Sequence, residues 1–124
     1  MPVSLAVAVG GALGALARYS LDRAIERRSV SLFPWSTFVI NVSGCLVAGV
    51  VIATLVDRHH TPLWLRAGLV MGFVGGYTTF STFAQETLDL VEEGRLALSI
   101  VYAAGSVGLG VAAVLVGIRL GRLG

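Results

Sequence analysis

Two glycines and two threonines interrupt the apolar stretch of residues 63–90. They are Gly75, Gly76, Thr78 and Thr79, and both residue types disfavour a continuous helix, glycine through backbone entropy and threonine through its β-branch. A helix that breaks in an apolar medium leaves main-chain carbonyl oxygens without donors, and these have to meet protein, water or a cation. The alternative interpretation is a glycine kink whose carbonyls are satisfied by threonine hydroxyls.

Hydrogen-bond donors and aromatic rings gather around this predicted break. Phe80 and Phe83 are three residues apart and therefore share one face of a helix. Aromatic pairs at that spacing usually pack a core or face lipid, but here their neighbours carry hydroxyl and amide groups. Asn41 is the most polar neutral residue inside an apolar stretch, and its alternative role is an interhelical hydrogen bond. The hydroxyl groups that extend this polar track belong to Thr37, Ser43, Ser81, Thr82, Tyr102 and Ser106.

One carboxylate, Glu86, and one guanidinium, Arg18, lie within a few turns of the ends of their apolar stretches. A pathway for cations would require several carboxylates or a continuous ring of carbonyl groups. Amide and hydroxyl groups instead donate hydrogen bonds, and the edges of phenyl rings carry partial positive charge. The residues therefore predict a narrow pathway for a small anion or a small polar solute.

The composition places this pathway in a membrane. Hydrophobic residues make up 56% of the 124 residues, charged residues make up 13%, and the mean hydropathy is +0.86. A soluble domain carries about 25% charged residues to cover its surface, so this chain is predicted to be an integral membrane protein with one domain, residues 1–124. The arginines are scattered at the ends of apolar stretches rather than gathered on one face, which excludes a nucleic-acid partner.

Four apolar stretches have the length of membrane-spanning helices: residues 3–21, 34–56, 63–90 and 96–120. Each reaches the roughly 20 residues that cross a hydrocarbon core. Short polar connectors, residues 22–32, 57–62 and 92–95, separate them. We therefore predict an all-α membrane protein with four transmembrane helices, the third broken mid-membrane, and with both termini on one side. Residues 3–21 lack the basic start of a signal peptide, so we expect this first helix to be retained.

The arginines at the ends of the apolar stretches give no clear orientation. Four arginines fall on the side of the termini (Arg58, Arg66, Arg119 and Arg122) and five on the other side (Arg18, Arg23, Arg27, Arg28 and Arg95). Either another determinant sets the topology, or the chain inserts both ways and an antiparallel pair is the functional unit.

Small residues spaced four apart predict close helix packing. Such spacing occurs in three sets: Gly10 with Gly14; Gly68 with Gly72 and Gly76; and Ala104 with Gly108 and Ala112. Because four short helices enclose little space, we expect a second copy to complete the pathway.

Three motifs follow one another along the chain, at residues 10–19 (GGALGALARY), 37–44 (TFVINVSG) and 72–83 (GFVGGYTTFSTF). Together they closely resemble the CrcB/Fluc fluoride channel family, and the resemblance covers essentially the whole chain. It implies an antiparallel, dual-topology homodimer in the cell (inner) membrane, with two narrow pores. These pores would passively export fluoride and so relieve its toxicity. It also implies a structural Na⁺ at the dimer centre, held by the main-chain oxygens of Gly75 and Thr78.

The resemblance also assigns roles to single residues. Phe80 and Phe83 match pore phenylalanines whose ring edges face the anion, and Asn41 matches the amide donor of the pore. Thr37 resembles a vestibule position, and Arg18 resembles an arginine near the pore entrance. Hydroxyl positions along the polar track are matched by Ser81, Thr82, Tyr102 and Ser106, and an acidic position beside the pore by Glu86. Gly110 stands where some relatives carry a further hydroxyl.

Other functions fit the sequence less well. A small multidrug exporter also has four helices and often dual topology, but it needs a carboxylate in its first helix, and residues 3–21 contain none. A non-transporting assembly subunit would not need the polar track. An enzyme is not expected, because the only histidines, His59 and His60, fall in a connector and no catalytic set occurs at membrane depth.

Overall fold

The computed structural model describes residues 1–56 and 60–124, and this part of the chain is helical without any strand. The helices in chain order are α1 (Val3–Glu26), α2 (Trp35–Val51), η1 (Ile52–Val56), α3 (Leu63–Ala67), η2 (Gly68–Val74), α4 (Gly75–Tyr77), α5 (Phe80–Glu92) and α6 (Leu96–Leu123). The segments η1 and η2 have the wider turn of a π-helix and continue α2 and α3. Part of the predicted connector 57–62, namely Asp57, Arg58 and His59, lies outside the described residues.

Proline and glycine mark the ends of several helices. Pro2, Pro34 and Pro62 stand directly before α1, α2 and α3, where the missing N–H of proline costs no helical hydrogen bond. Gly94 has a φ of 76° in the turn between α5 and α6. Residues with a side chain rarely adopt that conformation, so glycine allows the sharp reversal there.

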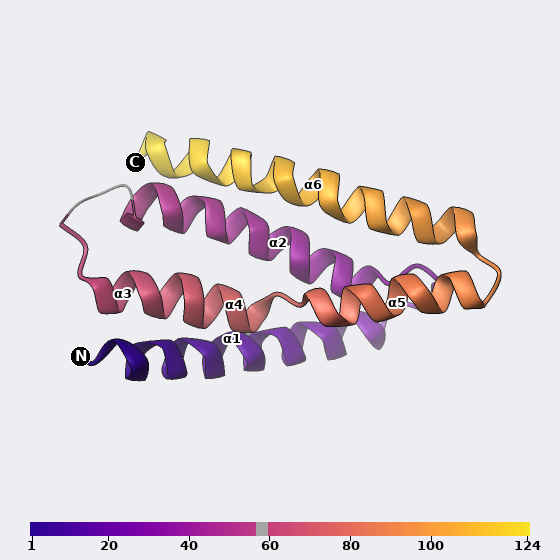
Figure 1. Cartoon of the computed structure of the whole chain (residues 1–124), viewed down its shortest axis with the longest axis horizontal. Coiled ribbons are helices and arrows are strands. Elements are labelled where there is room, and N and C mark those ends of the chain that lie inside the picture. Colours follow the sequence, from indigo (N-terminus) through magenta and orange to yellow (C-terminus); the bar gives the residue numbers. More distant parts are fainter. Residues whose placement is uncertain (57–59) are drawn as a thin grey trace.

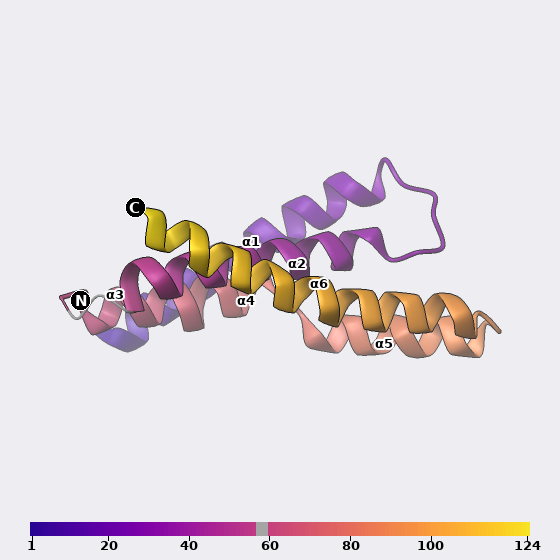
Figure 2. The same ribbon diagram turned by 90° about the horizontal axis from the view of Figure 1, so that it is seen from above.

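The helices form an elongated bundle with both termini at one end, as predicted (Figure 1). The most extensive packing joins α2 to α6, and α1 to the η2 and α4 segments. The end of α1 and the following connector diverge from the α5–α6 pair, which Figure 2 shows from above. The fully buried side chains among the described residues include Ile40 and Tyr102, so α2 and α6 supply the centre of the core.

Glycine brings the helix backbones into contact. A Cβ built on Gly10 would collide with the carbonyl oxygen of Gly68, and one on Gly49 would collide with that of Val114 on α6. The predicted close packing is therefore confirmed for the glycines of α1 and η2. The third small-residue set behaves differently, because a Cβ built on Gly108 would meet no atom of another helix within 4 Å in the described part of the chain.

Three helices among the described residues are long and apolar enough to cross a membrane: Val3–Glu26, Trp35–Leu55 and Leu96–Leu123. The third predicted stretch, residues 63–90, is divided into shorter helical segments. Many large apolar side chains on the long helices are exposed, including Leu13, Val107 and Leu115. Such a surface suits contact with lipid rather than with water.

The predicted connector 22–32 begins too early and is corrected by the structure. Helix α1 continues through Asp22 and Arg23 and ends only at Glu26. The reason is that polar residues do not themselves end a helix; these residues tolerate helical geometry, and no glycine or proline interrupts them. Asp22 consequently lies on α1, one helical turn beyond Arg18.

Candidate functional site

The helical path between α4 and α5 is interrupted at two threonines. Thr78 (φ −82°, ψ 158°) and Thr79 (φ −145°, ψ 116°) are both extended. Gly75 and Gly76 remain helical, so within the predicted segment 75–79 only the two threonines leave the helix. Thr79 also starts α5, because its side-chain oxygen accepts a hydrogen bond from the main-chain N–H of Thr82 at 3.3 Å.

Asn41 pairs with the interrupted main chain. Its Nδ2 donates to the carbonyl oxygen of Thr79 at 2.9 Å, and its Oδ1 accepts from the N–H of Thr79 at 2.8 Å. One side chain on α2 thus satisfies both main-chain groups of an extended residue that has lost its helical partners. The alternative role of Asn41, a hydrogen bond between helical segments, is therefore present. The second N–H of the amide remains for another acceptor.

The interruption changes the partners of the two predicted sodium ligands. In a continuous helix the N–H of Thr79 would donate to the carbonyl oxygen of Gly75, but here it donates to Asn41 instead. The main-chain N–H and hydroxyl of Thr78 both donate to the carbonyl oxygen of Val74, at 3.0 and 2.9 Å. Gly75 is exposed. The carbonyl of Gly75 thus loses its helical donor.

Aromatic rings continue from this point along α5. The ring centroids of Phe80 and Phe83 lie 5.8 Å apart at an interplanar angle of 48°, and Phe83 lies 5.2 Å from Tyr102 on α6. Phe83 is half-buried, whereas Phe80 is 79% exposed. The two predicted pore phenylalanines therefore form one row that begins on the outer surface of the single chain.

Glu86 joins three helices through its carboxylate. Its Oε1 accepts a hydrogen bond from the hydroxyl of Thr37 at 2.8 Å, and its Oε2 accepts one from the hydroxyl of Tyr102 at 2.6 Å. Thr37 and Tyr102 are buried, and Glu86 is partly buried. Three residues that were predicted separately thus form one network, and Glu86 follows Phe83 by three residues on the same face of α5.

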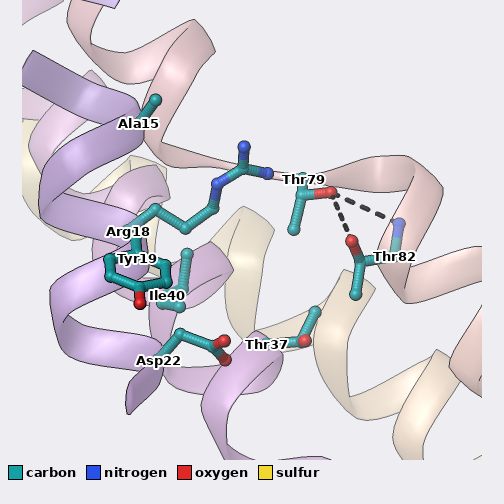
Figure 3. Close-up of a pocket in the computed structure, with 8 residues that line it drawn as sticks. All are labelled: Ala15, Arg18, Tyr19, Asp22, Thr37, Ile40, Thr79 and Thr82. Atoms are coloured by element: carbon teal, nitrogen blue, oxygen red, sulfur yellow. Dashed lines mark hydrogen bonds between the residues drawn. The ribbon is translucent and has the colours of Figure 1, made fainter. Parts of the chain in front are cut away.

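A pocket of about 300 Å³ lies between α1, α2 and the α4–α5 junction. We call it the Arg18 pocket, and its lining residues are Ala15, Arg18, Tyr19, Asp22, Thr37, Ile40, Thr79 and Thr82. Figure 3 shows Arg18 reaching from α1 toward the segment of Thr79, with the Asp22 carboxylate one turn further along the same helix. The pocket therefore combines one cation, one anion and several hydroxyl groups.

A second pocket lies on the other side of the junction. Its volume is about 290 Å³, and its lining includes Asn41, Cys45, Thr78, Thr79 and Phe80. Thr79 lines both pockets, so the Asn41–Thr79 pair stands between them. The predicted amide donor and the first phenylalanine are thereby brought together in one cavity.

The remaining hydroxyl positions are more dispersed. Ser81 and Thr82 are exposed at the start of α5. Ser106 has a buried hydroxyl without a hydrogen-bond partner among the described residues. One turn further along α6, a Cβ built on Gly110 would lie 3.4 Å from the sulfur of Cys45, so the polar track is replaced there by helix packing.

Sequence reasoning missed three polar residues of this region. Thr79 was treated only as part of the break, although threonine is one of the residues favoured at the N-cap of a helix. Asp22 was assigned to a connector, and Ser36 was not singled out. The hydroxyl of Ser36 donates to the carboxylate of Asp22.

Comparison with known proteins places the chain in a family. The family model described as CrcB-like protein, Camphor Resistance (CrcB), matches residues 5–118. The proteins named fluoride-specific ion channel FluC from Acidobacterium capsulatum and Solibacter usitatus are 44% and 46% identical to it over 118 residues. These alignments cover 94% and 95% of this chain and 93% and 97% of the relatives. The protein of the same name from Azotobacter vinelandii is 44% identical over 121 residues and is covered to 98%.

The helices and the similarity together define the class of protein. With long apolar helices and near full-length similarity to proteins named as ion channels, the chain is a multi-pass membrane protein. It belongs to the CrcB-like family.

Proposed function

We propose that this chain is a fluoride-selective channel of the cell (inner) membrane that passively exports fluoride. Two antiparallel copies form two pores around a structural sodium ion. The observation that carries this proposal is the meeting of Asn41, Thr79 and Phe80 in one cavity, in a chain 44–46% identical to proteins named as fluoride-specific ion channels.

The groups in this cavity favour an anion over a cation. The amide of Asn41 keeps one N–H beyond its bond to Thr79, and the ring edges of Phe80 and Phe83 are electropositive. Fluoride is small and strongly hydrated, so its passage requires donors that replace water without holding the ion too firmly. We expect passive conduction, because the described residues around this cavity include none that would bind an energy source.

A second copy would complete the wall of the pore. Phe80 is 79% exposed in the single chain. Apart from the adjoining backbone of α6, no atom of the described residues lies within 4 Å of a Cβ built on Gly105 or Gly108. An antiparallel partner would cover this open face of small residues and enclose the phenylalanines. In this proposal residues 63–90 make the third of four crossings, interrupted at Thr78 and Thr79. The balanced arginines permit insertion in both directions.

The α4–α5 junction also fits the proposed sodium ion. The carbonyl of Gly75 has lost its helical donor to Asn41, and the carbonyl of Thr78 belongs to an extended residue. Main-chain oxygens of this kind suit a hard cation, and in lipid they need a partner. Gly75 and Thr78 of both copies would hold the ion, which would supply charge to satisfy these carbonyls and fasten the two chains together.

Growth under fluoride stress tests the proposed function in cells. Expression of this chain in a bacterial strain without its own fluoride export should restore growth on fluoride, because passive efflux lowers internal fluoride. The variant Phe80→Ile, produced at the same level, should restore growth poorly. Absence of rescue by wild-type protein that is present in the membrane would contradict the proposal.

A further inference from the structure

Asp22 faces the same pocket as Arg18. Both residues lie on α1, one helical turn apart, and both line the Arg18 pocket. Asp22 is half-buried there, and its carboxylate accepts a hydrogen bond from the buried hydroxyl of Ser36 in the first turn of α2. The carboxylate is therefore held at the pocket rather than free in solvent.

The first turn of α2 receives carboxylates from two other helices. It contains no acidic residue of its own, although the N-terminal end of a helix attracts negative charge. Ser36 donates to Asp22 of α1, and the next residue, Thr37, donates to Glu86 of α5. Asp22 thus occupies a place at which a mobile anion would otherwise be attracted.

Without Asp22 the pocket would favour anions strongly. Its only charged group among the lining residues would be the Arg18 guanidinium, beside the hydroxyls of Thr79 and Thr82 and the positive end of α2. The Thr37 hydroxyl also lines the pocket, but it donates to Glu86. A conducting pathway requires binding that is favourable enough to admit the ion and weak enough to release it. A fixed negative charge beside Arg18 reduces the attraction without removing the donors.

Given the proposed fluoride conduction, we infer that Asp22 sets the anion affinity of the Arg18 pocket. Its carboxylate offsets the charge of Arg18 and of the α2 terminus, and so keeps the residence of fluoride in the pocket short. Asp22 tunes the affinity of the pathway through its charge and does not itself bind the anion.

Initial fluoride efflux from liposomes, measured against internal fluoride concentration, tests this inference. Asp22→Asn is nearly isosteric, and its side-chain oxygen still accepts from Ser36, so it removes charge alone. The half-saturating fluoride concentration should fall about fivefold, as expected for one unit charge a few ångströms away in a hydrated pocket. The maximal rate should not rise. The shift should shrink at high concentrations of an impermeant salt, because salt screens accessible charges.

Two control variants separate charge from structure. Glu26→Gln removes the same charge one turn further along α1, outside this pocket, and should leave the half-saturating concentration unchanged. Ser36→Ala removes the hydrogen bond but keeps the Asp22 charge, and should shift the half-saturating fluoride concentration less than twofold. Asp22→Ser provides a second neutral variant if thermal unfolding shows that Asp22→Asn is not folded.

The outcomes are distinguishable. A conducting wild type with an unchanged half-saturating concentration in both neutral variants overturns the inference alone. An equal shift in Glu26→Gln also overturns it, because the net charge of the chain would then explain the effect. An equal shift in Ser36→Ala overturns it as well, because the contact between α1 and α2 would then be the cause. A folded wild type that passes no fluoride overturns the proposed function, and the inference with it.

Discussion

The side-chain amide of Asn41 pairs with the main chain of Thr79 through one donor and one acceptor, which is how the main chains of neighbouring β-strands pair. The amide of Asn41 exchanges two hydrogen bonds, of 2.9 and 2.8 Å, with the main chain of Thr79 at the interruption between α4 and α5. This pair separates the Arg18 pocket from the pocket that contains Phe80. The interruption is thus stabilised by a residue of another helix, and removing that residue should affect both stability and conduction.

Asn41→Ala should destabilise the folded protein by about 1–3 kcal/mol, because the N–H and carbonyl of Thr79 would lose their partner. Thermal unfolding in detergent measures this change. Ser43→Ala, two residues further on α2, removes a hydroxyl that shares a hydrogen bond with Tyr77 and leaves the junction paired, so it should cost less. Equal destabilisation by the two variants would argue against a special role of the Asn41–Thr79 pair.

Phe80→Ile and Phe83→Ile should each lower fluoride efflux at least tenfold while the protein stays folded, because they remove an aromatic edge and roughly keep the volume. Efflux from liposomes, with size-exclusion chromatography as the folding check, provides the measurement. Phe73→Ile is the matched control, since Phe73 stacks on Tyr77 at 6.0 Å and lies outside the α5 row. Wild-type efflux in both α5 variants would remove the rings from the mechanism.

Tyr102→Phe should destabilise the protein by roughly 1–3 kcal/mol, because one carboxylate oxygen of the partly buried Glu86 would lose its donor. Thr37→Ala should have a similar effect through the other oxygen. Since both hydroxyls donate to the same carboxylate, the double variant should differ from the sum of the single ones by more than about 0.5 kcal/mol. Strict additivity in thermal unfolding would show that the three groups do not act together.

Gly49→Ala should destabilise the α2–α6 pair by about 1–3 kcal/mol, because the added methyl group would collide with the carbonyl of Val114. A methyl group added at Gly105 on α6 would meet no described atom within 4 Å outside its own helix, so Gly105→Ala should leave the fold of the single chain unaffected. Thermal unfolding of both variants makes the comparison. A larger loss in Gly105→Ala would place the critical packing on the open face of α6.

Replacing Na⁺ with a bulky organic cation should weaken the proposed dimer, because the carbonyls of Gly75 and Thr78 would lose their shared ligand. The dissociation of the detergent-solubilised dimer, followed by light scattering with and without Na⁺, measures this effect at constant ionic strength. An antiparallel dimer that is equally stable in both solutions would contradict a structural sodium ion.

The sequence predicted the helical class and most helix boundaries, because the apolar stretches, prolines and glycines are local signals. It placed the end of α1 too early, because Asp22 and Arg23 are polar yet compatible with a helix. It predicted an interruption within residues 75–79, and the structure limits it to Thr78 and Thr79, where Asn41 pairs with an extended main chain. That position depends on a partner from another helix, which no local pattern reveals.

The sequence predicted which residues belong to the candidate site, but it did not predict the contacts between them. Thr37, Glu86 and Tyr102 were all named from the sequence, but their shared carboxylate required the packing of α2, α5 and α6. The Ser36–Asp22 contact was missed for the same reason. These residues are 14 positions apart, and they meet only because the connector between α1 and α2 turns the chain back on itself.

Fluoride-electrode recording of purified protein in liposomes tests the central claim most directly, with chloride efflux recorded from matched vesicles. A pathway lined by the Asn41 amide and the edges of Phe80 and Phe83 should release fluoride rapidly and chloride scarcely at all. Equal efflux of the two halides, or no fluoride efflux from folded and inserted protein, would contradict the account.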